Sequence, residues 1–190
     1  LRFNRDCVIA LSGAPVNASL DNQPIPLWQA VSIKAGNTLK LGAAATTGAR
    51  TYLALQGGLD VPLYLGSRAT FTLGQFGGHA GRALRVGDVL HLNPATDLQA
   101  QSITPELVPE YSHHWQIGVL YGPHGAPDFF TDDDIQQFFA TDWEVHYNSS
   151  RTGVRLIGPK PQWARTDGGE VDGGLGAVSI HIHRPEQPQR

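Results

Sequence analysis

The residues best suited to chemistry are the two arginines of the run Arg151-Thr152-Gly153-Val154-Arg155. Alternate side chains of a β-strand share one face, so Arg151 and Arg155 would project together, with Gly153 and its missing side chain between them. Each planar guanidinium can donate two parallel hydrogen bonds, which suits a carboxylate, a carbonate or a ureido oxygen. Two solvated arginines paired with nearby acids would give the same pattern, so the run alone leaves both interpretations open.

A second candidate is the glycine-rich loop QFGGHAGR, which runs from Gln75 to Arg82. Consecutive backbone N–H groups around Gly77 and Gly78 would form an anion-binding nest, with His79 and Arg82 at its rim. The loop lacks the Lys-Ser/Thr ending of a P-loop, so we do not expect it to bind a nucleotide phosphate. A plain tight loop would need the same glycines, and the pattern does not decide between the two.

Two single side chains complete the set of candidates. His124 follows a predicted strand in the run YGPHG, and its imidazole could exchange a proton near neutral pH, although an exposed loop histidine without a role fits equally well. Asn148 lies in the turn that precedes Arg151 and is a candidate for binding substrate.

Other catalytic classes find little support. His113 and His114 would point apart in an extended chain, and His181 and His183 would share a strand face, but neither pair has a third ligand at a familiar spacing, so no metal site is expected. The sequence has no Gly-x-Ser-x-Gly nucleophile elbow. Cys7 lies in an apolar run, and we expect it to be a buried small hydrophobe and not a nucleophile.

Composition favours a β-rich fold of soluble type. The 190 residues include 22 glycines and 13 prolines, and no long helical period is present. The net charge of −3 gives no case for binding nucleic acid or an anionic membrane. No apolar run approaches the roughly 20 residues of a membrane span, and neither a signal peptide nor a disulfide pair points to export, so we expect a cytoplasmic protein.

Short apolar runs separated by turn residues predict the strands that must position these candidates. Two hairpins are expected, one around the turn at 21–24 and one around 35–37. The predicted strands cover residues 7–11, 16–20, 25–28, 31–33, 38–41, 52–55, 86–92, 116–121, 144–147 and 151–157, and the run 86–92 contains a turn at Gly87 and Asp88. The one predicted helix starts at Thr131, which can form a capping box with Asp134, and it buries a stripe of Ile135, Phe138 and Phe139.

Many short motifs resemble one family, the second carboxyltransferase half of biotin-dependent urea carboxylase, also known as urea amidolyase or allophanate hydrolase subunit 2. The motifs are QGG (56–58), DVP (60–62), GSR (66–68), TF (70–71), FGG (76–78), GR (81–82), GDVL (87–90), YGPHGAPDFFT (121–131), WEVHYNSSRTGVRLIGPKP (143–161) and WARTDGGE (163–170). The resemblance is closer to urea carboxylase than to the relatives that act on 5-oxoproline. It ends at Glu170, so the chain is expected to be truncated, with an atypical tail at 171–190.

The resemblance implies a mainly β fold with an α+β portion: part of a cyclophilin-like β-barrel at 1–95, a linker at 96–114 and a small strand–helix–hairpin unit at 115–170. It implies carboxyl transfer from carboxybiotin to urea, giving allophanate. Biotin would arrive on a carrier domain, ATP would bind only a partner biotin carboxylase domain, and the first carboxyltransferase half would complete the site.

On the same basis, the catalytic residues would be Arg151, Arg155 and His124. The substrate-binding residues would be Gln75, Gly77, Gly78, His79, Arg82 and Asn148. The chain is not expected to be active alone. The alternative is a truncated, stand-alone cyclophilin-like module that binds a small molecule or a protein partner without catalysis.

Overall fold

The computed structural model describes residues 1–44, 47–95, 102–120, 122, 125–149 and 153–164. The chain divides into two compact units, Leu1–Trp115 and Gln116–Arg190. The finer division into a linker at 96–114 and a tail at 171–190 stays a prediction.

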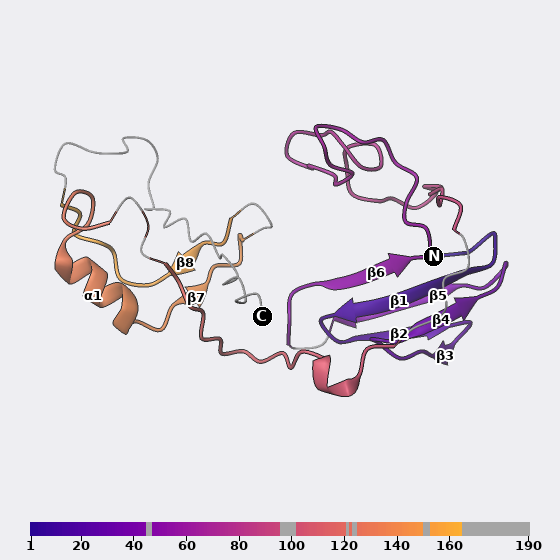
Figure 1. The fold of residues 1–190 in the computed structure, drawn as a ribbon, viewed down its shortest axis with the longest axis horizontal. Helices are drawn as coiled ribbons and strands as arrows, with labels where there is room; N and C mark the ends of the chain where they lie inside the picture. The colour runs from indigo at the N-terminus through magenta and orange to yellow at the C-terminus, as the bar shows by residue number, and fades with distance from the viewer. Residues whose placement is uncertain (45–46, 96–101, 121, 123–124, 150–152, 165–190) are drawn as a thin grey trace, which may run out of the picture. The chain divides into compact units, whose positions relative to one another are not determined.

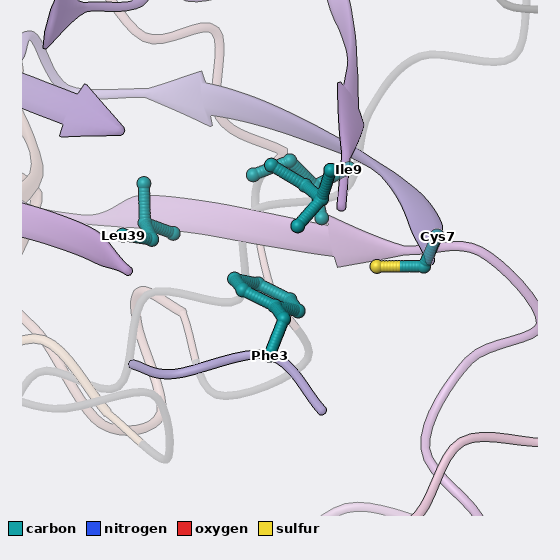
Figure 2. Close-up of a cluster of buried hydrophobic side chains, with 5 residues drawn as sticks. Phe3, Cys7, Ile9 and Leu39 are labelled. Atoms are coloured by element: carbon teal, nitrogen blue, oxygen red, sulfur yellow. The ribbon is translucent and has the colours of Figure 1, made fainter. Parts of the chain in front are cut away.

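The first sheet of the first unit has β1 (Cys7–Gly13) at its centre, with β4 (Ala30–Ile33) and β6 (Thr51–Leu55) antiparallel on either side. Side chains of β1 alternate between buried and half-buried positions, as a strand with one core face requires. Ile9 and Leu11 are fully buried. Figure 2 shows Cys7 and Ile9 packed in one cluster with Phe3 and Leu39. The strand predicted at 7–11 and the buried Cys7 are therefore confirmed.

The second sheet places β2 (Val16–Leu20) between β3 (Gln23–Pro24) and β5 (Leu39–Ala44). Asp21 and Asn22 both have positive φ, 48° and 69°, which is the backbone of a two-residue hairpin turn. The predicted first hairpin is confirmed, but its second arm is wrong in position. The arm begins at Gln23 because the turn takes only two residues, and the predicted strand at 25–28 is not formed.

The predicted second hairpin, between 31–33 and 38–41, is wrong. β4 pairs with β1, whereas β5 pairs with β2, so the two strands belong to different sheets. Hydrogen bonds at both ends of the connecting segment are consistent with the split. Lys34 donates to Asp6, just before β1, and the N–H of Thr38 donates to Asp21, in the hairpin turn after β2.

The second unit contains α1 (Asp132–Ala140), whose N-terminus is closed by the predicted capping box between Thr131 and Asp134. Ile135 and Phe138 are half-buried, which confirms two positions of the predicted stripe. Phe139 is wrong, because it is 60% exposed. β7 (Glu144–Val145) and β8 (Leu156–Ile157) form the predicted antiparallel hairpin with shorter arms.

Two further predicted strands do not form. Residues 116–120 are irregular, and Tyr121 lies outside the described residues. Within 86–92, the N–H of Asp88 donates to the carbonyl of Arg85 in a turn, so only Leu92 makes a strand-like bridge, to Leu59. A 3₁₀ turn, η1 (Pro105–Leu107), follows in the first unit.

The described strands thus form three antiparallel sheets, and none of the three closes into a barrel (Figure 1). The mainly β class is confirmed, while the cyclophilin-like barrel stays a prediction. In the part of the chain that the structure describes, no helix combines the length and the apolar character that a membrane span requires.

Candidate functional site

The glycine-rich candidate lies within a long loop that leaves β6 and closes on itself, here called the 57–93 loop (Figure 1). Leu59 bridges to Leu92, and the N–H of Asp60 donates to the carbonyl of His91 at 2.8 Å. The Asn93 side chain donates to the carbonyls of Gly57 and Leu59 at 3.1 and 3.2 Å. These bonds hold the two ends of the loop together. Long loops without secondary structure that are held in shape commonly carry function.

The charged centre of the loop is Asp88. Arg82 donates to both of its carboxylate oxygens, at 2.7 and 2.8 Å, and the N–H of Arg85 adds a third bond at 2.7 Å. His79 Nε2 lies 3.8 Å from the same carboxylate. Hydrogen bonds from Arg82 and then Arg85 hold the pKa of Asp88 well below its usual range, and the pair raises the pKa of Arg82.

Asp88 therefore brings the two predicted rim residues, His79 and Arg82, to one place. Sequence reasoning assigned Asp88 only to a turn and missed this role. The signal was present as an acid six residues after Arg82 in a glycine-rich stretch. Because Arg82 is engaged in this bidentate pair, it holds the shape of the loop, and its contact with a bound anion stays a prediction.

The glycines of the loop permit close backbone approach. Gly81 has φ +65°, and a Cβ there would collide with the carbonyl of Gln75. Gly77 and Gly78 have positive φ as well, 73° and 52°, and Gly78 lies against Thr70. The anion-binding nest around these two glycines stays a prediction.

The second group of candidates lies in the hairpin of β7 and β8. The hydroxyl of Ser149 donates to the carbonyl of His146 at 2.7 Å and accepts from the N–H of Arg155 at 3.0 Å. These two bonds hold the backbone of the exposed Arg155 against Ser149, the residue next to Asn148. Arg151 and His124 lie outside the described residues, so the shared face of Arg151 and Arg155 stays a prediction. Convergence of this hairpin with the 57–93 loop stays a prediction too.

His146 is a residue that sequence reasoning did not single out. Its Nδ1 accepts from the N–H of Asn148 at 3.0 Å, so the neutral ring carries its proton on Nε2. The ring stacks on Tyr147 with centroids 4.2 Å apart. The only signal in the sequence was the run HYN directly before the turn.

Asp134 fixes the segment that follows this hairpin. It accepts from the N–H groups of Thr131, Gln162 and Trp163 at 2.9, 2.7 and 3.2 Å. Burial opposes ionisation, but the hydrogen bonds from these N–H groups outweigh it and lower the pKa of Asp134. Among the residues described, no three His, Cys, Asp or Glu side chains are grouped closely enough to hold a metal ion.

Comparison with known families decides the identity of this scaffold. The sequence matches the family described as "Carboxyltransferase domain, subdomain A and B" over residues 1–188. The chain belongs to this carboxyltransferase family. The match extends past Glu170, where the motif resemblance had ended.

Among relatives of this carboxyltransferase chain, urea amidolyase of Saccharomyces cerevisiae is 49% identical over 186 residues, covering 94% of the chain and 10% of that protein. A 5-oxoprolinase subunit of Escherichia coli is 32% identical over 162 residues, covering 83% of the chain and 49% of the relative. The crystal structure of Kluyveromyces lactis urea carboxylase superposes with a TM-score of 0.81 at 46% identity, covering 88% of this chain and 16% of that one. The carboxyltransferase chain thus spans a small part of the urea-related proteins.

Proposed function

We propose that this carboxyltransferase chain forms part of the centre that moves a carboxyl group from carboxybiotin to urea, giving allophanate. The observation that carries the proposal is the 49% identity with urea amidolyase across 94% of the chain, against 32% with the 5-oxoprolinase subunit. The difference in identity favours the urea-related branch of the family over the 5-oxoproline-related one.

The donors on this chain fit the groups that such a reaction presents. A carboxylate, a ureido oxygen and a urea oxygen all accept hydrogen bonds, and the exposed Arg155 guanidinium and Asn148 amide both donate. Carboxybiotin would supply the carboxyl carbon, which leaves the ureido nitrogen for a urea nitrogen in exchange for a proton. A carrier domain would deliver the biotin.

Each candidate has a role in this proposal. Arg155 and Arg151 orient the carboxylate and disperse negative charge on the ureido oxygen, which is the charge that develops during transfer. His124 moves the proton that passes from the urea nitrogen to the ureido nitrogen. The backbone donors of Gly77 and Gly78, together with Gln75, His79, Arg82 and Asn148, bind and orient urea.

We also propose the remaining machinery from the family. The first carboxyltransferase half, a biotin carboxyl carrier and an ATP-using biotin carboxylase would act with this chain in the cytoplasm. A cyclophilin-like barrel would be completed around the described sheets.

The proposal can be tested in a chimera in which this chain replaces the matching segment of Saccharomyces cerevisiae urea amidolyase. ATP-dependent and biotin-dependent formation of allophanate is measured for the parent, for Arg155→Ala and for the control Arg5→Ala, an exposed arginine of the first unit. We expect Arg155→Ala to lower kcat/KM for urea by about 100-fold or more, as loss of a charge-stabilising donor does. A folded chimera that forms no allophanate, or an Arg155→Ala variant as active as Arg5→Ala, would refute the assignment.

A further inference from the structure

The 57–93 loop exposes large apolar side chains without a core of its own. Within the described residues, Val61 is the one large aliphatic residue of the loop that is buried. More than half of the residue's surface is exposed at Leu63, Leu65, Leu73, Leu84, Val86 and Val89. Six large apolar side chains exposed within one loop are unusual for a free-standing domain, and we take them as a sign of contact with other protein.

The backbone that presents these side chains is held in a defined shape. Phe71 and Phe76 exchange two backbone hydrogen bonds, at 2.9 and 3.3 Å, and the ring of Phe76 packs on Tyr64 at 5.1 Å. The bonds of Asn93 with Gly57 and Leu59 fix the two ends of the loop, and the pair of Arg82 with Asp88 fixes a turn within it. The apolar side chains are therefore offered on an ordered surface and do not collapse on one another.

The chemistry of this surface favours a permanent apolar contact. Asp88 pairs with Arg82, and the other charged side chains of the loop, Asp60, Arg68 and Arg85, are few and of mixed sign, so the loop offers no cluster of one charge to a transient partner or an anionic membrane. Permanent interfaces are more hydrophobic than transient ones and resemble a domain core cut in two. A covering segment of the same domain fits these properties.

We propose that the exposed apolar side chains of the 57–93 loop dock against the part of the carboxyltransferase domain that lies beyond the matched region. The 5-oxoprolinase subunit of Escherichia coli is matched over 49% of its length, so a relative of this kind carries about as much chain again. That remaining half is the partner, and it covers Leu73 and Val86. The same contact fixes the loop that holds Asp88 and the glycine turn.

Thiol labelling tests this contact, and the chain offers a built-in reference. Its single cysteine, Cys7, is buried in β1, and burial raises the pKa of the thiol, so Cys7 labels slowly while the fold is intact. Leu73→Cys and Val86→Cys are labelled with a maleimide in the isolated chain and in the urea amidolyase chimera, and each site is quantified by peptide mass spectrometry. The matched control is Gln29→Cys, an exposed residue of the first unit outside the loop.

Both loop thiols should label rapidly in the isolated chain and at least about tenfold more slowly in the chimera, because only transient opening would expose them. Gln29→Cys should label at the same rate in both. Equal labelling of Leu73→Cys and Val86→Cys in the two settings would overturn the proposal. So would sedimentation of the isolated chain as a dimer that Val86→Asp dissociates, because the occupant would then be a second copy.

A chimera that misfolds would reveal itself by labelling of Cys7. The footprint is then taken on the intact 5-oxoprolinase subunit of Escherichia coli, at the positions aligned with Leu73 and Val86, with the same two outcomes. No urea or biotin enters these assays, so their result does not depend on the proposed reaction.

Discussion

Replacing Asp134 by alanine should destabilise the helix–hairpin unit by about 2 kcal/mol. Three backbone N–H groups lose their acceptor, those of Thr131, Gln162 and Trp163. Gln162 is exposed, so water can replace the carboxylate there, whereas Thr131 and Trp163 are half-buried and each lose about 1 kcal/mol. These two half-buried groups therefore set the size of the expected effect.

Hydrogen exchange of the α1 amides is the direct assay, because it reports the free energy of opening for this unit alone. Asp133→Ala is the matched control: it lies in the same helical turn, is exposed and should change the opening free energy by about 0.5 kcal/mol through the helix dipole. An Asp134→Ala variant that opens no more easily than Asp133→Ala would refute the reasoning.

The effect of Asp134 should also depend on pH. Its folded-state pKa is lowered, so its contribution to stability is complete above the unfolded-state value of about 3.9 and is lost as the pH falls through the folded-state value. The difference in opening free energy between the parent chain and Asp134→Ala should therefore be constant from about pH 5 to 7 and shrink below about pH 4. A difference that grows on acidification would contradict the assigned hydrogen bonds.

Two further predictions concern the 57–93 loop. Asp88→Asn removes one of the two oxygens that accept from Arg82, so the amides of Phe76 and Gly81 should exchange faster while those of β1 do not change; unchanged exchange in the loop would show that the pair does not hold it. Gly81→Ala places a methyl group against the carbonyl of Gln75, so it should perturb the loop's NMR chemical shifts widely. The control Gly36→Ala also replaces a positive-φ glycine, but its methyl group meets open space, and it should perturb its surroundings less. Equal perturbation by the two variants would show that the strain comes from the positive φ alone and not from the contact with Gln75.

Features set by neighbouring residues could be predicted from the sequence. The capping box of α1 depends on two side chains three residues apart, and the hairpin after β2 depends on an Asp-Asn turn, so both are local. The strand at Cys7 was marked by its own apolar alternation. Each of these elements lies where the pattern put it, within a few residues.

Features set by distant partners could not be predicted. The run 31–41 looks like a hairpin, but bonds from Lys34 to Asp6 and from Thr38 to Asp21 separate its arms into two sheets. The apolar run 86–92 looks like a buried strand, yet Asp88 is taken up by Arg82 and Val86 is left exposed. In both cases a hydrogen bond to a partner outside the apolar run overrides the local hydrophobic pattern, and a single sequence does not show such bonds.

The candidate site divides in the same way. The residue types at Arg155, Asn148 and the glycine turn could be chosen from chemistry and spacing, whereas the anchoring roles of Asp88, Ser149 and His146 depend on contacts made only in the fold. Side chains that hold a loop in place leave a weaker trace in the sequence than those that meet a ligand.

The central claim is that this chain serves transfer of a carboxyl group to urea and not to another acceptor. It is tested most directly by initial rates of ATP-dependent carboxylation in the urea amidolyase chimera, with urea and 5-oxoproline supplied separately. We predict allophanate formation with urea that falls sharply in Arg155→Ala and not in Arg5→Ala, and no turnover with 5-oxoproline. Turnover of 5-oxoproline with none of urea would contradict the claim.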